Sequence, residues 1–209
     1  MRSLSLLVVL ALSVFSTFTT AEAVMVINEV DYDQPGTDTA EFVELFNSGP
    51  ASVSLNGYRL DFINGADPTD PYQSFDLSGF TVLSGGFLVI CANGATVANC
   101  DLDIAPDENL MQNSVDGLAL FDPSGLVDSM SYEGDILGVT EGLGAQADIS
   151  TVTGSLSRFP DGLDTQNNFA DFYFGGITPG TANVPEPTTA LLLASGLIGL
   201  AISGRRRRA

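Results

Sequence analysis

Carboxylates dominate the reactive side chains of this 209-residue sequence. It contains 26 Asp and Glu residues against 7 basic residues, all of which are arginine, and neither His nor Lys occurs. Ser-His-Asp, Cys-His and Ser-Lys catalysis, as well as zinc sites built on His, need one of the missing residue types. Two carboxylates can still hydrolyse a glycosidic bond. With so many acids present, however, no pair stands out, and we expect the protein not to be an enzyme.

The negative charge lies between the two ends of the chain. The formal net charge is −19, although Arg2 and the four arginines 205–208 sit near the termini, so the region between them is still more acidic. Such a surface repels nucleic acid and anionic membranes. Solubility in an extracellular medium is one explanation of this charge, and binding of divalent cations is the alternative.

One acidic loop begins like a calcium-binding motif. Residues 31–36 read Asp-Tyr-Asp-Gln-Pro-Gly, but position twelve of the motif is Phe42, where an EF-hand needs a bidentate Glu. An EF-hand is therefore excluded, while a different calcium site stays open. Its candidate ligands are Asp31, Asp33, Asp38 and Glu41. A second candidate group consists of Asp101, Asp103, Asp107 and Glu108.

The two cysteines, Cys91 and Cys100, flank a loop that contains the turn signal Asn93-Gly94. Their spacing is not that of a CxxC redox site, and a cysteine nucleophile would lack a histidine base. In an exported chain the sequence predicts a disulfide between them. Closing so short a loop contributes about 2 to 3 kcal/mol at most.

Two glutamates interrupt apolar runs. Glu29 and Glu44 lie where strands are expected, and burying an unpaired carboxylate is costly. Since Arg59 and Arg158 are the only cations between the termini, we expect at least one of these glutamates to pair with one of these arginines.

The region from residue 24 to 183 has the pattern of an all-β protein. Short apolar alternations, such as residues 58–62, are separated by turn signals, and no long stretch has helical periodicity. The continuous apolar run 87–90 is expected to be a strand buried on both faces. The clearest hairpin joins residues 117–121 to 126–132 through Asp122-Pro123-Ser124-Gly125, which fits a type I turn. Seven to nine strands are expected. They favour a β-sandwich, with a barrel as the alternative.

The N-terminal end has the features of a secretory signal. Arg2 precedes an apolar run of about 15 residues, and the small-residue exit is Ala21-Glu22-Ala23. We therefore expect residues 1–23 to be a signal peptide cleaved after Ala23. A retained anchor is disfavoured, because the run is shorter than the roughly 20 residues that span a bilayer.

The C-terminal end has three parts, which begin with an extended motif. Its residues are Val184, Pro185, Glu186 and Pro187. An uncharged segment, 188–204, follows and spans about 25 Å as a transmembrane helix. The chain ends on the cluster Arg205, Arg206, Arg207 and Arg208, which by the positive-inside rule places the C-terminus in the cytoplasm.

This three-part tail resembles the PEP-CTERM sorting signal of exported bacterial proteins. The resemblance implies that an exosortase, a membrane-embedded processing enzyme, recognises the tail and cleaves near 184–187. The body of the protein would then reach the cell surface or the extracellular matrix. A plain single-pass membrane anchor is the alternative.

The domain between the two ends resembles a lamin tail domain, an immunoglobulin-like β-sandwich. The segments that carry this resemblance are 27–30 and 41–47 with 55–58 at the opening, 83–90 in the centre, and 157–162 with 178–183 at the close. Three segments, 31–39, 91–100 and 134–154, are insertions by this resemblance and have no assigned role.

Together these features predict an exported, non-enzymatic surface or matrix protein. The precursor would cross the inner membrane once, and residues 24–183 would form a structural or binding module. Extracellular polysaccharide or surface proteins are the expected partners besides the exosortase. The alternatives are a carboxylate-based extracellular hydrolase and a calcium-dependent adhesin.

Overall fold

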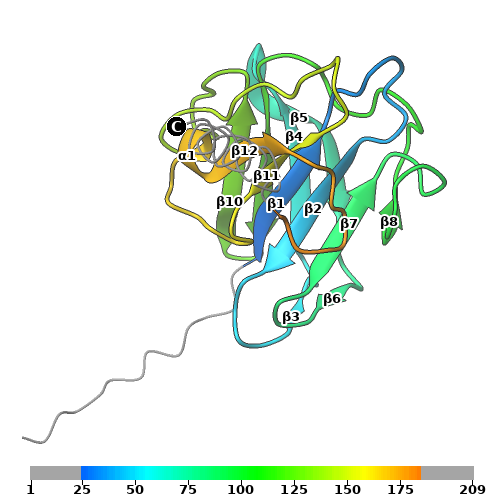
Figure 1. Ribbon diagram of the computed structural model, residues 1–209. Coiled ribbons are helices and arrows are strands. Elements are labelled where there is room, and N and C mark those ends of the chain that lie inside the picture. The colour runs from blue at the N-terminus through cyan, green and yellow to red at the C-terminus, as the bar shows by residue number, and fades with distance from the viewer. Residues whose placement is uncertain (1–24, 185–209) are drawn as a thin grey trace, which may run out of the picture.

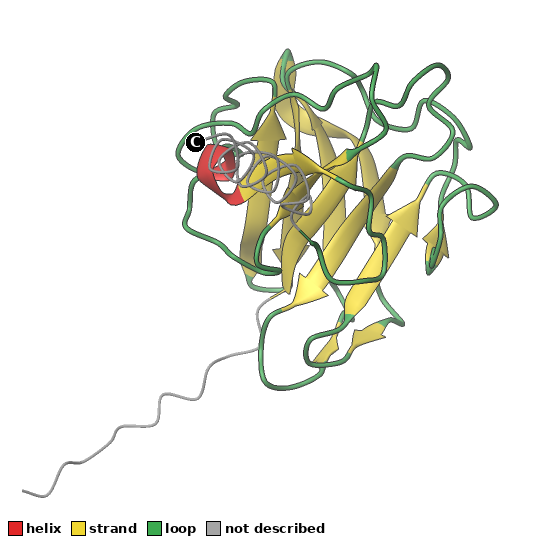
Figure 2. Cartoon of the chain, viewed as in Figure 1, coloured by secondary structure: helices red, strands yellow, loops and turns green. Residues whose placement is uncertain are grey.

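The computed structural model describes residues 25–184, and these fold into an all-β sandwich. Figure 2 shows strands joined by loops, with the short helix of the described residues in red. In chain order the elements are β1 (Met25–Asp31), β2 (Phe42–Asn47), β3 (Val53–Ser54), β4 (Arg59–Asn64), β5 (Asp67–Asp76), β6 (Thr81–Val82), β7 (Phe87–Cys91), β8 (Leu102–Asp103), β9 (Asp116–Asp122), β10 (Gly125–Tyr132), β11 (Ser155–Arg158), α1 (Asn168–Asp171) and β12 (Phe172–Gly175).

Two sheets form the layers of the sandwich. The larger sheet has six strands in the order β12-β11-β1-β2-β7-β8, and the smaller has four in the order β10-β9-β4-β5. In Figure 1, β1, β2 and β7 form one layer, with β4, β5 and β10 behind them. The short strands β3 and β6 pair separately. The structure thus confirms the sandwich and not the barrel, and it has more strands than expected because three of them are only two residues long.

The main core lies between the two sheets and follows the alternation of the strands. Leu60 and Phe62 of β4 enter it, while Arg59 is exposed on the opposite face. In β7 the run is buried on both faces, as the sequence predicts: Leu88 and Ile90 join the main core, whereas Val89 joins a second cluster.

The second cluster covers the outer face of the larger sheet. Phe42 of β2 and Val89 pack there against Val97 from the cysteine loop and Ile177 from the C-terminal segment. The larger sheet is therefore buried on both sides, and the chain just before the predicted sorting motif forms part of its cover.

The predicted hairpin is confirmed as β9 and β10, which pair antiparallel from Asp116 to Tyr132. Its closing turn is fixed by Asp122, whose Oδ1 accepts the backbone N–H groups of Ser124 and Gly125. An Asp at the first turn position commonly caps its own turn in this way.

Several predictions concern segments beyond the described part of the chain. The signal peptide, 1–23, and the tail from Pro185 onward, including the transmembrane helix 188–204 and the arginine cluster, lie outside it. Between residues 25 and 184, no helix has the length and apolar character needed to cross a membrane.

Candidate functional site

The last segment of the fold, residues 177–183, is fastened to the outer face of the larger sheet by two buried glutamates. Glu29 of β1 accepts hydrogen bonds from the backbone N–H and the Oγ1 hydroxyl of Thr178, both at 2.8 Å. Glu44 of β2 accepts the backbone N–H of Gly180 at 2.6 Å. Both glutamates are fully buried. We call this arrangement of Glu29, Glu44 and residues 177–183 the exit anchor.

A β-bulge in β1 allows the exit anchor to form. Ile27 pairs with Leu45 and Glu29 pairs with Glu44, so Asn28 has no partner residue on β2. A bulge shifts the alternation of side chains along a strand. Met25 and Ile27 face the main core before the bulge, and Val30 and Tyr32 do so after it. Glu29 is thereby turned to the outer face.

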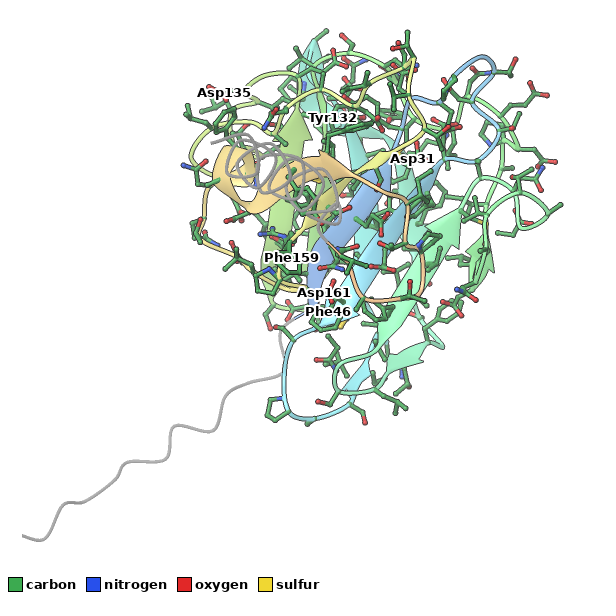
Figure 3. The ribbon with its side chains drawn as sticks, in the orientation of Figure 1. Asp31, Phe46, Tyr132, Asp135, Phe159 and Asp161 are labelled. Carbon is green, nitrogen blue, oxygen red and sulfur yellow. A yellow bond between two sulfur atoms is a disulfide. The ribbon has the colours of Figure 1, made fainter. Side chains whose placement is uncertain are left out.

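The extra residue of the bulge links the glutamates to the end of the fold. The Nδ2 of Asn28 donates to Glu44 Oε1 at 2.9 Å and to Asp161 Oδ1 at 3.0 Å. Asp161 Oδ1 also accepts the backbone N–H of Asn183 at 3.0 Å. Figure 3 places Asp161 next to Phe46, near the end of the sheet. The Nδ2 of Asn183 donates in turn to the backbone oxygens of Asn28 and Arg158.

Asn183 is the last buried residue of the described chain. It is 3% exposed, whereas Val184, the last described residue, is 65% exposed. The predicted sorting motif therefore begins directly after the last buried residue.

Burial changes the acid strength of both anchoring glutamates. Desolvation raises the pKa of Glu44 to about 8, although the hydrogen bonds from Asn28 and Gly180 oppose this change. Desolvation also raises the pKa of Glu29, against the hydrogen bonds from Ser155 and Thr178. Neutral donors hold these carboxylates without a compensating positive charge.

The expectation that Glu29 or Glu44 pairs with an arginine is wrong. Among the described residues, Arg59 forms an ion pair with Asp61 at 2.8 Å, and Arg158 pairs with three aspartates. The reason is the direction of the side chains. On β11, Leu156 faces the main core and Arg158 lies on the same side, whereas Ser155, on the other side, donates to Glu29 at 2.6 Å.

Arg158 instead joins elements from both sheets in the interior. Its fully buried guanidinium donates to Ile27 O at 2.8 Å, to Asp171 Oδ2 at 3.0 Å and to Asp128 Oδ1 at 3.1 Å. It lies over the ring of Phe172, 4.5 Å from the centroid. This one cation thus connects β1, β10, β11 and β12.

The first group of predicted calcium ligands does not converge on one point. Asp38 accepts the N–H of Gln34 and the Nδ2 of Asn113, and Glu41 accepts the backbone N–H groups of Leu110 and Met111. Asp31 lies deeper, at the end of β1, and accepts the Nε2 of Gln34. Calcium binding by this set stays a prediction.

The second predicted group is engaged with the cysteine loop. Asp101 accepts the backbone N–H of Val89 at 2.9 Å, and Asp103 accepts that of Gly94 at 3.1 Å. Both carboxylates therefore help to fold this loop. The predicted disulfide between Cys91 and Cys100 is confirmed, with a Cα–Cα distance of 5.8 Å.

Sequence reasoning missed the tightest acid cluster among the described residues. Asp128, Glu141 and Asp164 have carboxylate oxygens within 4.8 Å of one another. Burial raises the pKa of Asp128 to about 6 and that of Glu141 to about 7. The positive charge of Arg158 already faces this cluster. These acids come from separate loops and strands, so no spacing in the sequence could have joined them.

The chain matches the models of two sequence families, and the longer match shows to which family the chain belongs. The model of the lamin tail domain family matches residues 19–134, which is more than half of the chain. The chain belongs to the lamin tail domain family. The all-β sandwich is consistent with the immunoglobulin-like fold that this family implies.

The second match is to the PEP-CTERM protein-sorting motif, over residues 183–208. This motif marks the lamin tail domain protein as exported, with a membrane-anchored precursor that is processed by an exosortase and sorted to the cell surface. The match begins at Asn183, the residue at which the exit anchor ends. No curated protein matches the chain.

The lamin tail domain match ends just after β10. It includes Glu29 and Glu44 but not Asp161, Thr178 or Asn183. The assignment of segments 157–162 and 178–183 to the family therefore stays a prediction. Both segments supply partners of the exit anchor. Their resemblance to the close of the family was therefore the only sequence signal that pointed to these residues.

Proposed function

We propose that this chain is a non-enzymatic lamin tail domain module of the cell surface or extracellular matrix, which an exosortase releases from its C-terminal tail. The exit anchor holds the chain up to Asn183, and the enzyme cleaves at or near the motif that starts at the exposed residue Val184. The folded module stays intact during this step, because every strand of residues 25–184 comes before the end of the anchor at Asn183.

One observation carries this proposal: the sorting motif begins where burial ends. A processing enzyme needs an extended, accessible substrate, and Pro185 and Pro187 disfavour helical conformation in the residues before them. The change from 3% exposure at Asn183 to 65% at Val184 leaves no loose linker between the module and the motif. Processing would therefore yield a module with a short, defined C-terminal end.

The cluster of Asp128, Glu141 and Asp164 does not favour a hydrolase. Retaining and inverting glycosidases separate their two carboxyl groups by about 5 to 9.5 Å around an open sugar site. In the tightest cluster here the oxygens lie within 4.8 Å, and the side chain of Asp128 is fully buried against Arg158. A sugar would have to displace this ion pair to reach the acids.

The details of location belong to the same proposal. The precursor spans the inner membrane once through residues 188–204, with the arginine cluster in the cytoplasm. After cleavage the acidic module meets extracellular polysaccharide or other surface proteins. Its charge keeps it soluble there and away from nucleic acid.

The proposal is tested by following the full chain in a bacterium that has a matching exosortase. The variant replaces Pro185, Glu186 and Pro187 with alanine, and Thr189→Ala serves as the control just outside the motif. Wild type and control should yield a surface protein whose intact mass ends at or before Pro187. The triple variant should stay in the membrane fraction at its unprocessed mass.

Three results would count against the proposal. Retention of wild-type chains through Ala209 in the inner membrane would make the tail a plain anchor. Unchanged processing of the triple variant would show that the enzyme does not read this motif. Hydrolysis of extracellular polysaccharides by the purified wild-type chain would favour the alternative, a carboxylate hydrolase.

A further inference from the structure

The loop between the two cysteines contacts the segment that precedes the sorting motif. This cysteine loop, residues 92–99, follows β7 and is closed by the disulfide between Cys91 and Cys100. Asn99, its last residue, donates from Nδ2 to the backbone oxygen of Pro179 at 2.8 Å. Pro179 belongs to the exit anchor, which Figure 1 shows in orange as it passes over β2. The contact therefore joins the disulfide-closed loop to the end of the fold.

The contact at Asn99 depends on close backbone approach and on an unusual conformation. A Cβ atom on Gly180 would lie only 2.6 Å from the Cβ of Asn99, so no side chain fits there. Asn99 has φ +53°, a left-handed conformation that costs free energy and persists where neighbouring structure holds it. Hydrogen bonds hold the tip of the loop at Gly94 and Thr96. The covalent link next to Asn99 is at Cys100, so the disulfide holds the residue that contacts the exit anchor.

The disulfide also lies in the apolar cluster beneath the exit anchor. Cys91 and Val97 are buried in this second cluster, and Cys100 and Ile177 pack against it. The loop and the exit segment do not pack continuously, because a cavity of about 220 Å³ lies between them, lined by Val97 and Ile177 among others. Atoms that face a cavity have fewer packing contacts. The few remaining contacts, at Asn99 and Ile177, therefore depend on the position of the loop.

We propose that the disulfide between Cys91 and Cys100 locks the exit anchor, so that the redox state of these cysteines sets how firmly residues 177–183 are held. Two thiols form the bond by passing two protons and two electrons to the disulfide of an exported thiol-oxidising protein, which becomes a dithiol. In the reduced chain, residues 176–183 open and become accessible to proteases. The lock rests on the proposed function and extends it, because it gives the processed module its defined C-terminal end.

The test is amide hydrogen exchange of the full-length chain in detergent, measured by mass spectrometry of its peptides. The probes are the backbone N–H groups of residues 178, 180 and 183, which donate to carboxylates in the oxidised fold. Replacing both cysteines with alanine removes the disulfide and leaves no thiol. Exchange of the probes should become about 10- to 100-fold faster. The β9–β10 hairpin, residues 116–132, is the internal control and should exchange at the wild-type rate.

Two single variants test the route through Asn99. Asn99→Gly keeps the disulfide and tolerates the same φ, but it removes the side chain that donates to Pro179, so exchange of the probes should again be faster. Asn93→Gly is the matched control, since it makes the same substitution at the other end of the loop, where the side chain accepts the N–H of Ala95. It should leave the probes at the wild-type rate.

Chemical reduction provides a comparison without any substitution. Dithiothreitol should speed exchange of the probes in the wild type and have no effect on the double-alanine chain. If the double-alanine chain does not fold, the reduced wild type and Asn99→Gly still decide the question. In the bacterium, the double-alanine chain should give several C-terminal ends within residues 176–183, where the wild type gives one.

Probes that exchange at the wild-type rate in both the double-alanine chain and Asn99→Gly would overturn the proposal. An equal acceleration in the β9–β10 hairpin would also overturn it, because the disulfide would then stabilise the whole fold and not the exit in particular. The exchange experiment contains no exosortase. Its result is therefore independent of whether the tail is processed, which the intact mass of the surface protein decides.

Discussion

Replacing Arg158 with methionine should cause the largest loss of stability of any single change at the described arginines. The substitution keeps an unbranched side chain for packing but removes the cation that joins β1, β10, β11 and β12. It leaves Asp128 and Asp171 behind, and the side chains of both are completely buried.

The size of the loss follows from what those aspartates retain. Asp171 still accepts two hydrogen bonds from Thr165, at 2.8 and 2.6 Å, and Asp128 still accepts the backbone N–H of Ile27 at 2.6 Å. Neither aspartate loses all of its hydrogen-bond donors, so the full cost of burying an isolated ion does not apply. Removing one member of a buried ion pair typically costs about 3 to 5 kcal/mol. For a protein of this size the melting temperature should fall by about 6 to 20 °C.

The matched control is Arg59→Met. The side chain of Arg59 is 48% exposed and forms one ion pair, with Asp61 at 2.8 Å. Asp61 keeps the hydroxyl of Ser74 as a donor at 2.6 Å. An exposed pair of this kind contributes about 1 kcal/mol or less. The two variants therefore remove the same residue type from a buried and from an exposed environment.

The assay is urea unfolding of the full-length chain in detergent, monitored by tyrosine fluorescence at pH 5 and pH 8. The deficit of Arg158→Met should be smaller at pH 5. Burial already raises the pKa of Asp128 to about 6 in the presence of the arginine, so without it the acid takes up a proton more readily and the unpaired charge disappears. Equal losses for the two variants, or a deficit at position 158 that does not change with pH, would refute the reasoning.

Three further changes test other parts of the fold. In the wild type, stability should decline between about pH 4.5 and 8, because the folded state holds a proton on Glu44 that the unfolded chain has released over this range. Glu44→Gln should make this decline less steep. Urea unfolding across the same pH range in the presence of a chelator checks the prediction, and an unchanged slope contradicts it. Cys100→Ser should cost about 2 to 3 kcal/mol by freeing the loop from Cys91, and a reducing agent should lower the stability of the wild type but not of the variant. Thr178→Val should lower the free energy of unfolding by about 1 to 2 kcal/mol, because it removes the hydroxyl that donates to Glu29. It should also speed limited proteolysis near residue 183. Cleavage at the wild-type rate would show that the exit anchor does not depend on this hydrogen bond.

Local patterns predicted much of the framework. The alternation in β4 and the turn signal at 122–125 identified a strand and a hairpin that the structure contains, because both depend on residues close together in the chain. The buried run of β7 was recognisable since both of its faces are apolar. The short strands β3, β6 and β8 were not, because two residues carry no periodicity.

The partners of the buried charged side chains could not be predicted in the same way. The sequence showed that Glu29 and Glu44 need partners but not that these would be the N–H and hydroxyl groups of residues 178 and 180. That choice depends on the bulge at Asn28, which turns Glu29 to the outer face, and on the direction in which β11 presents Arg158. The bulge is a property of the pairing of β1 with β2, and the direction of Arg158 depends on the pairing of β1 with β11, whose residues lie more than a hundred positions apart.

The sequence by itself determined the destination of this protein, since the sorting motif is a continuous segment, residues 183–208. It also determined that the chain has too few cations to neutralise its own acids. Only the tertiary structure decided which acids stay uncompensated. Burial depends on the packing of distant segments, and it leaves Glu29 and Glu44 held by neutral donors at the exit of the chain.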